Sequence, residues 1–206
     1  LVIGLPKRYY RNMLSKEKLS VLYISERKSM QEIADIFDCS LHKVKYWMSK
    51  HGIAIRARKD AMYVKYNPDG DPFKIKIPKN LSQAKLFGLG LGLYWGEGTK
   101  ASKSSIRLGN TDPALIRMFI RFLVEMFEIE KDDMRFALQI FTDISVKRAL
   151  KFWKKELGIK QSQFMKPIIT RSGSLGTYRK KSEYGVMTVM YHNRKLRDIL
   201  VEMLSI

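Results

Sequence analysis

The chain has 206 residues, of which 45% are hydrophobic, so it is long enough for one medium-sized core or two small ones. Its formal net charge is +19, which argues against a typical enzyme of small molecules and predicts a polyanionic partner. The single cysteine, Cys39, excludes an intrachain disulfide or thiolate metal site, and no apolar run reaches the roughly 18 residues of a membrane span. We therefore expect an intracellular protein that has no membrane partner.

Residues 1–66 are expected to form a small all-α domain of three short helices. Ser15 can cap the first helix, and Ser29 with Glu32 has the spacing of a capping box for the second. Ser40 follows a tight turn and can cap the third helix. The pattern therefore predicts two short helices joined by a tight turn, preceded by one further helix.

The third helix is expected to have one apolar and one cationic face. Val44, Trp47 and Met48 share the apolar face at helical spacing, which leaves lysines on the other. A helix with a cationic outer face after a tight turn can lower side chains into a DNA major groove, where each base pair presents a distinct pattern. The stretch SMQEIADIFDCSLHKVKYWM resembles the helix-turn-helix of resolvases and many regulators, with small Ala34 in its second helix and Cys39 in its turn.

The same domain supplies a set of expected DNA contacts. Basic residues that closely follow Gly52 are similar to arms that contact phosphates or enter the minor groove. The residues of this domain expected at DNA are His42, Lys43, Lys45, Tyr46, Lys50, Arg56, Arg58 and Lys59. Residues 67–80, NPDGDPFKIKIPKN, contain three prolines and are expected to be the linker to a second domain over residues 81–206.

The stretch LFGLGLGLYWGEGTK, residues 86–100, places several glycines in an otherwise apolar helix. Ser82 can cap a helix that runs to Gly96, and each interior glycine costs about 1 kcal/mol relative to alanine. Gly88, Gly92 and Gly96 are spaced four apart and share one face, where another backbone could approach closely. The spacing therefore predicts a dimer helix, packed against a partner helix at near-contact distance.

Glu97 follows this helix, at the end where the helix dipole disfavours a negative charge. Gly98 is expected to end the helix in the left-handed conformation. A carboxylate in an unfavourable position is typical of a functional residue. Two such helices packed side by side would bring two carboxylates together at their shared end, an oxygen-ligand site that suits Mg²⁺.

The nine residues GLGLYWGEG, at positions 90–98, resemble the motif of the LAGLIDADG homing endonuclease family. Gly92 and Gly96 fall on its small helix-packing positions. Glu97 falls on its metal-binding acid, and Gly98 on its terminal glycine. The resemblance implies two motif helices at the interface of two αββαββα units, an acid from each helix at the catalytic metal, and β-sheets over the DNA major groove. It makes Glu97 the catalytic and metal-binding residue, with Gly96 beside it at the metal.

Two residues depart from the motif, because Gly90 replaces its leading leucine and Trp95 stands where an aspartate is common. After the motif, alternation and amphipathic spacing predict strands and helices in the order that the family shows. The expected strands are 104–110, 133–143 and a hairpin of 163–172 and 184–193 around a basic loop; the expected helices are 113–129, 144–159 and 194–204. The expected fold class is therefore α+β, a small helical domain followed by a mixed domain with an antiparallel DNA-binding sheet.

A single motif of this type occurs, so a catalytic pair of acids requires two chains and predicts a homodimer on a roughly palindromic site. Both domains are basic, so both are expected to touch double-stranded DNA. The cations of the second domain expected at DNA are Lys100, Lys103, Arg107, Arg171, Arg179, Lys180 and Lys181.

Four interpretations remain open. The first is sequence-specific binding of double-stranded DNA with Mg²⁺-dependent phosphodiester cleavage. The second is a DNA-binding transcriptional regulator that keeps the fold and has lost cleavage. The third, a maturase-like RNA-binding protein, suits the helix-turn-helix less well. The fourth is a tightly packed core helix that carries Glu97 incidentally at the surface.

Overall fold

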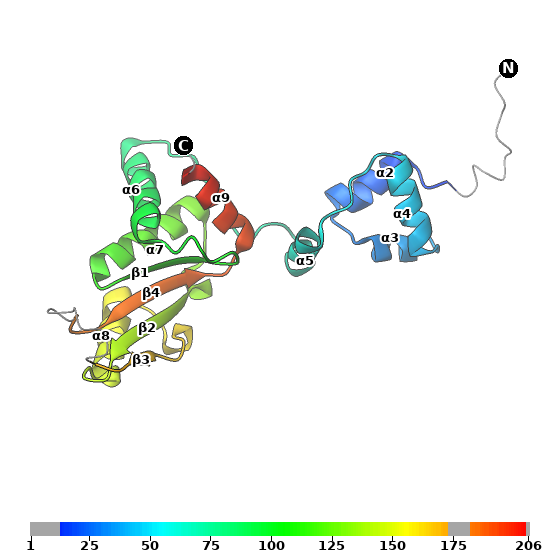
Figure 1. The fold of residues 1–206 in the computed structure, drawn as a ribbon. Helices are drawn as coiled ribbons and strands as arrows, with labels where there is room; N and C mark the ends of the chain where they lie inside the picture. The colour runs from blue at the N-terminus through cyan, green and yellow to red at the C-terminus, as the bar shows by residue number, and fades with distance from the viewer. Residues whose placement is uncertain (1–12, 173–181, 205–206) are drawn as a thin grey trace, which may run out of the picture. The chain divides into compact units, whose positions relative to one another are not determined.

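The structure, a computed structural model, describes residues 13–172 and 182–204. The chain divides into two compact units, Leu1–Asp71 and Pro72–Ile206, which we call the N-terminal unit and the C-terminal unit (Figure 1). The N-terminal unit is helical, and the C-terminal unit combines helices with a four-stranded sheet. The predicted α+β class is therefore confirmed.

The N-terminal unit forms its helices where the capping residues predict them. Its elements are α2 (Lys16–Ser20), which continues into the π-helical turn η1 (Val21–Ser25), α3 (Met30–Ile36), α4 (Leu41–Lys50) and α5 (Arg58–Tyr66). The hydroxyls of Ser15 and Ser40 accept hydrogen bonds from the first turns of α2 and α4. Ser29 and Glu32 form the capping box of α3.

One hydrophobic cluster joins α2, α3 and α4, and its fully buried members include Leu19, Ile33, Val44 and Met48. Helix α5 contributes no buried residue to it. The sequence pattern predicts a basic arm in this place, but Arg58 and Lys59 begin a regular helix instead.

The C-terminal unit alternates between helices and strands. Its elements are α6 (Leu81–Glu97), β1 (Ile106–Asn110), α7 (Pro113–Phe127), η2 (Lys131–Asp133), β2 (Arg135–Phe141), α8 (Val146–Leu157), η3 (Gln161–Gln163), β3 (Ile168–Thr170), β4 (Val186–Tyr191) and α9 (Arg194–Leu204). The strands form one sheet in the order β1-β4-β2-β3. Strand β4 runs antiparallel to β1 and β2, whereas β3 runs parallel to β2. The sheet is therefore mixed, and the prediction of a purely antiparallel sheet is wrong.

The predicted hairpin of residues 163–172 and 184–193 is also wrong, because β2 lies between β3 and β4. Two backbone hydrogen bonds fasten the segment around β3 to β2. The Met165 N–H donates to the Phe136 carbonyl at 2.8 Å, and the Thr142 N–H donates to the Thr170 carbonyl at 3.0 Å. Alternating side chains indicate a strand but not its partner, so the sequence does not separate a hairpin from two strands that flank a third.

The boundary between the units lies inside the predicted linker. Phe73 is buried in the hydrophobic core of the C-terminal unit. The Lys74 N–H donates to the Phe127 carbonyl at 3.0 Å, and the Lys76 N–H to the Met126 carbonyl at 2.9 Å, both at the end of α7. The second half of residues 67–80 is thus an extended segment packed on the C-terminal unit. Prolines exclude a helix there, but they do not exclude packing.

The core of the C-terminal unit lies between its helices and one face of the sheet. Alternate residues of β1, β2 and β4 point into this core, among them the buried Leu108, Leu138 and Val189. Helix α8 adds the large side chain of Trp153. The residues that point the other way are half-buried or exposed, apart from Met190. We call this second surface the outer face of the sheet; it consists of Arg107, Gly109, Arg135, Ala137, Gln139, Val186, Thr188 and Met190.

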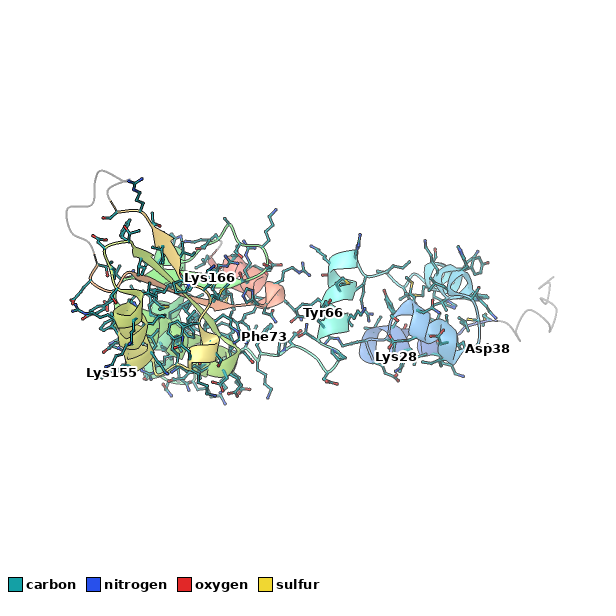
Figure 2. The ribbon with its side chains drawn as sticks, turned by 90° about the horizontal axis from the view of Figure 1, so that it is seen from below. Lys28, Asp38, Tyr66, Phe73, Lys155 and Lys166 are labelled. Atoms are coloured by element: carbon teal, nitrogen blue, oxygen red, sulfur yellow. The ribbon has the colours of Figure 1, made fainter. Side chains whose placement is uncertain are left out.

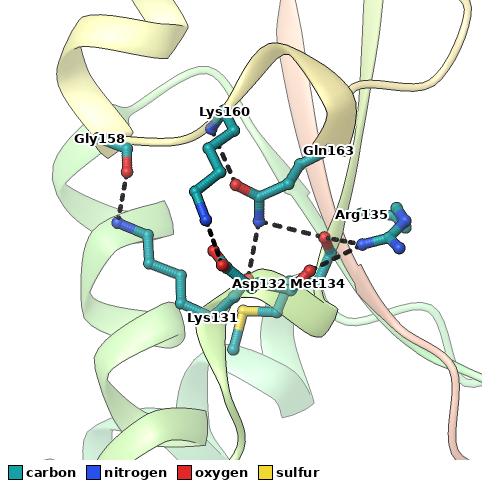
Figure 3. Close-up of polar contacts among 7 residues, drawn as sticks. All are labelled: Lys131, Asp132, Met134, Arg135, Gly158, Lys160 and Gln163. Atoms are coloured by element: carbon teal, nitrogen blue, oxygen red, sulfur yellow. Dashed lines mark hydrogen bonds and ion pairs between the residues drawn. The ribbon is translucent and has the colours of Figure 1, made fainter.

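The buried side chain of Gln163 fastens the connection after α8 to the start of β2 (Figure 3). Its amide N–H groups donate to the carbonyls of Lys131 at 2.8 Å and Met134 at 3.4 Å. Its side-chain carbonyl accepts the Lys160 N–H at 2.8 Å. The Lys131 ammonium also donates to the Gly158 carbonyl at 3.1 Å. This cluster is satisfied within itself, so we assign it a structural role.

Candidate functional site

Helix α6 starts two residues earlier than the sequence predicts, at Leu81. Asn80 caps the helix, because its side-chain oxygen accepts the Gln83 N–H at 2.9 Å. Ser82, the predicted cap, lies inside the helix. The helix then continues to Glu97, so its last turn carries the residues that the sequence singles out.

The glycines of α6 face two directions. Gly90 faces inward, where an added Cβ would stand 2.1 Å from the Phe122 ring, so this close approach requires glycine. Gly88, Gly92 and Gly96 are exposed, and a Cβ at any of them would meet nothing within 4 Å. Phe122 therefore explains why glycine is required at position 90. The three glycines spaced four apart have no such explanation among the described residues.

The exposed surface around these glycines is largely apolar, although the exposed Lys85 lies on it too. Trp95 is 63% exposed and Leu89 is 43% exposed. Ala84 is exposed as well, and it continues the row of small residues by one turn. We call this surface the glycine face of α6; it consists of Ala84, Lys85, Gly88, Leu89, Gly92, Trp95 and Gly96. An apolar helix face of this kind is typical of a surface that packs against another protein element.

Gly98 does not adopt the predicted left-handed conformation. Its φ is −74° and its ψ is 142°, which is extended backbone. Gly98 forms a β-bridge with Leu108, and the following Thr99 N–H donates to the Arg107 carbonyl at 2.9 Å. A Cβ at Gly98 would stand 2.3 Å from the Tyr94 ring. Glycine is therefore required here because the chain passes close over Tyr94 to reach the edge of β1, and not because of its φ.

Glu97 is exposed at the end of α6, and its carboxylate makes no hydrogen bond or ion pair with the part of the chain that the structure describes. The Lys100 ammonium donates to the Trp95 carbonyl in the last turn of the helix. Arg197 of α9 in turn donates to the Lys100 carbonyl. The segment that follows Glu97 is thus tied to the helix and to α9, so the carboxylate is presented from a fixed backbone.

Tyr94 lies under this segment, fully buried and stacked on Phe119 with 6.1 Å between ring centroids. Burial raises the pKa of the Tyr94 phenol, and the positive charge of Arg197 acts in the opposite direction. The phenol therefore stays protonated at neutral pH. Tyr94 supports the end of α6 and is not placed to exchange protons with solvent.

The end of α6 offers few ligands to a metal ion. Among the described residues, no cluster of three or more His, Cys, Asp or Glu side chains is placed to hold a metal ion. Glu97 offers one carboxylate, and the backbone carbonyl of Gly96 precedes it in the chain. Mg²⁺ usually keeps several waters and takes one or two carboxylates together with phosphate oxygens. One chain therefore offers a single carboxylate at this end of the helix, and a magnesium ion there would need further oxygen ligands.

The outward side of α4 carries the predicted helical DNA contacts. His42, Lys45, Tyr46 and Lys50 are exposed, and Lys43 is half-buried. The Tyr46 ring packs edge-on against Trp47 with 5.3 Å between centroids. The Lys50 ammonium lies 5.8 Å from the centre of the Tyr46 ring. This surface combines positive charge with a supported aromatic ring, on the side of α4 that faces away from the core.

Arg56 does not belong to that surface. Its backbone N–H donates to the Tyr23 hydroxyl at 2.8 Å. Its guanidinium donates to the carbonyls of Lys28, at 2.9 Å, and Tyr23, and lies 4.0 Å from the centre of the Tyr23 ring. Arg56 thus locks the segment after α4 onto the end of η1. Its geometry is that of a structural residue and not of the phosphate contact that its position predicts. Arg58 and Lys59 remain exposed.

The outer face of the sheet brings together side chains from distant segments. Arg107 on β1 and Arg135 on β2 both stand opposite Met190 of β4, so the two arginines flank one strand. The Arg107 Nε–H donates to the Ser105 hydroxyl at 2.8 Å, which orients the side chain. Gln139 lies further along β2 on the same face. Arg135 and Gln139 are not among the predicted DNA contacts, although the alternation in RFALQIF places both opposite the buried residues.

The remaining predicted contacts are spread over loops. Lys103 is exposed, and Lys100 is half-buried by its bond to the helix end. Arg171 is exposed just after β3. Arg179, Lys180 and Lys181 lie outside the described residues.

No known protein family, no curated protein and no solved structure matches this chain. Within residues 13–172 and 182–204, no helix has the length and apolar character needed to cross a bilayer. The function is therefore inferred from the surfaces of the chain itself.

Proposed function

We propose that this protein is a homodimeric DNA endonuclease, which binds double-stranded DNA at a specific sequence and cleaves phosphodiester bonds with Mg²⁺. The observation that carries the proposal is the geometry of α6. Its glycine face is exposed and largely apolar, and the helix ends at Glu97, whose carboxylate has no partner among the described residues. A dimer helix that delivers a metal-binding acid requires both features.

The energetics of α6 support a second copy as the partner of its glycine face. Gly88, Gly92 and Gly96 each cost the helix about 1 kcal/mol relative to alanine, and no contact within the described residues offsets this. A second α6 crossing at these glycines would bring the two backbones close together and would bury Leu89 and Trp95. A two-fold interface uses the same patch on both chains, and an axis that runs along the paired helices would also bring the two Glu97 carboxylates to the same end.

Two surfaces support double-stranded DNA as the partner. The outward side of α4 presents cations and Tyr46 after a capped turn, as a helix that enters the major groove does. The outer face of the sheet presents Arg107, Arg135 and Gln139, side chains that can contact phosphates and base edges. The net charge of +19 favours both contacts.

In such a dimer, Glu97 and the Gly96 carbonyl of each chain would hold the metal. Bound Mg²⁺ would supply an activated water and would stabilise the negative charge of the phosphate. Lys100 is the cation tied to the end of α6, so we assign it the neutralisation of charge on the cleaved strand.

A transcriptional regulator is the second candidate, and a specific observation favours it. Trp95 is 63% exposed and precedes Glu97 by two residues. The LAGLIDADG family, whose motif this stretch resembles, commonly has an aspartate at that position. Each chain therefore brings one acid to the shared end of the helices. If that pair no longer holds metal, the same dimer would bind its DNA site without cutting it.

The proposal is tested with the full chain on a DNA site selected from random duplexes. Wild type is expected to cut this site with Mg²⁺ or Mn²⁺ and not in EDTA. Glu97→Gln should bind with the same Kd and should not cut. Glu202→Gln, which removes an exposed carboxylate from α9, is the matched control and should cut like wild type. Cleavage that survives in Glu97→Gln would remove Glu97 from the site, and binding without any metal-dependent cutting would establish the regulator.

A further inference from the structure

Helix α8 carries a second concentration of positive charge, which the proposed function does not use. Ala149, Trp153 and Leu157 face the core of the C-terminal unit. The remaining sides of the helix carry Lys147, Arg148, Lys151, Lys154, Lys155 and a single acid, Glu156. The lysines are exposed, and Figure 2 shows Lys155 on the outer side of α8.

Ion pairs account for part of this charge. Arg148 pairs with Glu183, and the Arg117 guanidinium holds Glu156 at 2.6 Å. The four lysines make no hydrogen bond or ion pair with residues 13–172 or 182–204 through their side chains. We call these residues, Lys147, Lys151, Lys154 and Lys155, the lysine row of α8.

The lysine row is unfavourable for an isolated helix. Lys147, Lys151 and Lys155 are spaced four apart, so like charges are neighbours on the helix surface along its whole length. Lys147 lies in the first turn, where the helix dipole disfavours a cation, and that turn contains no acid. The helix dipole favours cations in the last turn, so it accounts for Lys154 and Lys155 but not for Lys147 or Lys151. A row that breaks two local rules indicates an external polyanion.

The lysine row and the outer face of the sheet lie on opposite sides of the C-terminal unit. Helix α8 packs through Trp153 on the core face of the sheet, together with Leu138 and Val189. Arg107 and Arg135 point from the other face. A duplex on the outer face of the sheet therefore leaves the lysine row free for another segment.

We propose that the lysine row of α8 is a second DNA-binding surface, which holds the sugar-phosphate backbone of a duplex segment without reading its sequence. Lysines suit this role because each is a flexible point charge that neutralises a phosphate but does not select a base. The proposal rests on the proposed function only in taking duplex DNA as the partner, and it does not require cleavage.

The test is a salt titration of binding to a 40-base-pair duplex of random sequence, in EDTA. It compares full-length wild type with the variant Lys147→Gln/Lys151→Gln/Lys155→Gln. Each lost phosphate contact should reduce the slope of log K against log salt by about 0.9, so the variant should lose a slope of about 2 to 3 and bind more weakly at low salt. Far-UV circular dichroism should show an unchanged fold, because the substitutions remove repulsion.

A control variant separates contact from net charge. Lys16→Gln/Lys18→Gln/Lys65→Gln removes the same charge from exposed positions on α2 and α5, and it should keep the wild-type slope. An equal loss of slope in both variants, or no loss in the α8 variant, would overturn the proposal. Tighter binding of wild type to single-stranded RNA through the same lysines would overturn the duplex assignment. Because these titrations contain no metal, a protein that never cuts DNA can still give the expected result.

Discussion

Gly90 of α6 faces the core and Gly92 faces outward, so alanine at these two positions should have opposite effects on the free energy of unfolding. At Gly90 an alanine Cβ would stand 2.1 Å from the Phe122 ring, so the ring would have to retreat by about 1.3 Å to reach the 3.4 Å of an ordinary contact. Phe122 is fully buried among other aromatic rings, with Phe127 at 5.2 Å between centroids, so there is little room to retreat. At Gly92 the alanine Cβ would meet nothing within 4 Å.

The magnitudes follow from two opposing effects. Either substitution stabilises the helix by about 1 kcal/mol, because alanine has a higher helix propensity than glycine. Overpacking at Gly90 costs about 3 kcal/mol, so Gly90→Ala should lower the free energy of unfolding by about 2 kcal/mol. Gly92→Ala should raise it by about 1 kcal/mol in the monomer. Urea unfolding at low protein concentration, followed by far-UV circular dichroism, measures the difference. Equal stability of the two variants would refute the inward position of Gly90.

Three further predictions concern stability. Arg56→Gln should destabilise the N-terminal unit by about 2 kcal/mol in thermal melts, because carbonyls at the end of η1 lose a charged donor, and it should leave the Kd for DNA unchanged. Gln163→Ala should cost about 1 to 3 kcal/mol in urea unfolding, because it leaves buried backbone groups without partners. The Ser29 N–H donates to the Glu32 carboxylate and holds its pKa below the usual 4.5. The stability that this bond contributes is therefore fully present above pH 4.5 and is lost as the pH falls through the lowered pKa of the folded state. In acid titrations followed by circular dichroism, Glu32→Gln should lack that loss of stability.

Local rules predict the helices well because their signals lie in a few neighbouring residues. Ser15, Ser29 and Ser40 each cap the helix that the sequence assigns to them. The prediction of Ser82 as the cap of α6 is wrong, because Asn80 caps the helix; both residue types are good caps, and the chain that enters the helix decides between them. The α+β class follows from the same periodicities.

Long-range contacts account for what the sequence could not predict. Arg56 looks like a free cation in the sequence, and only the fold brings Tyr23 and the carbonyl of Lys28 to its guanidinium. The pairing of β3 with β2 depends on Phe136 and Met165, which are far apart in the chain. The sequence predicts a left-handed φ at Gly98, whereas its backbone is extended and the close passage over Tyr94 is what requires glycine.

The most direct test of the paired α6 helices is a mixing experiment with Glu97→Gln. Wild type and variant are combined in equal amounts, their subunits are exchanged, and the rate at which single strands of the selected site are cut is measured at constant total protein. If both Glu97 carboxylates of a dimer are needed, random pairing leaves about one quarter of the dimers active, so cleavage should fall to about one quarter of the wild-type rate. A rate of about one half would mean that each chain acts alone, and would contradict the paired site.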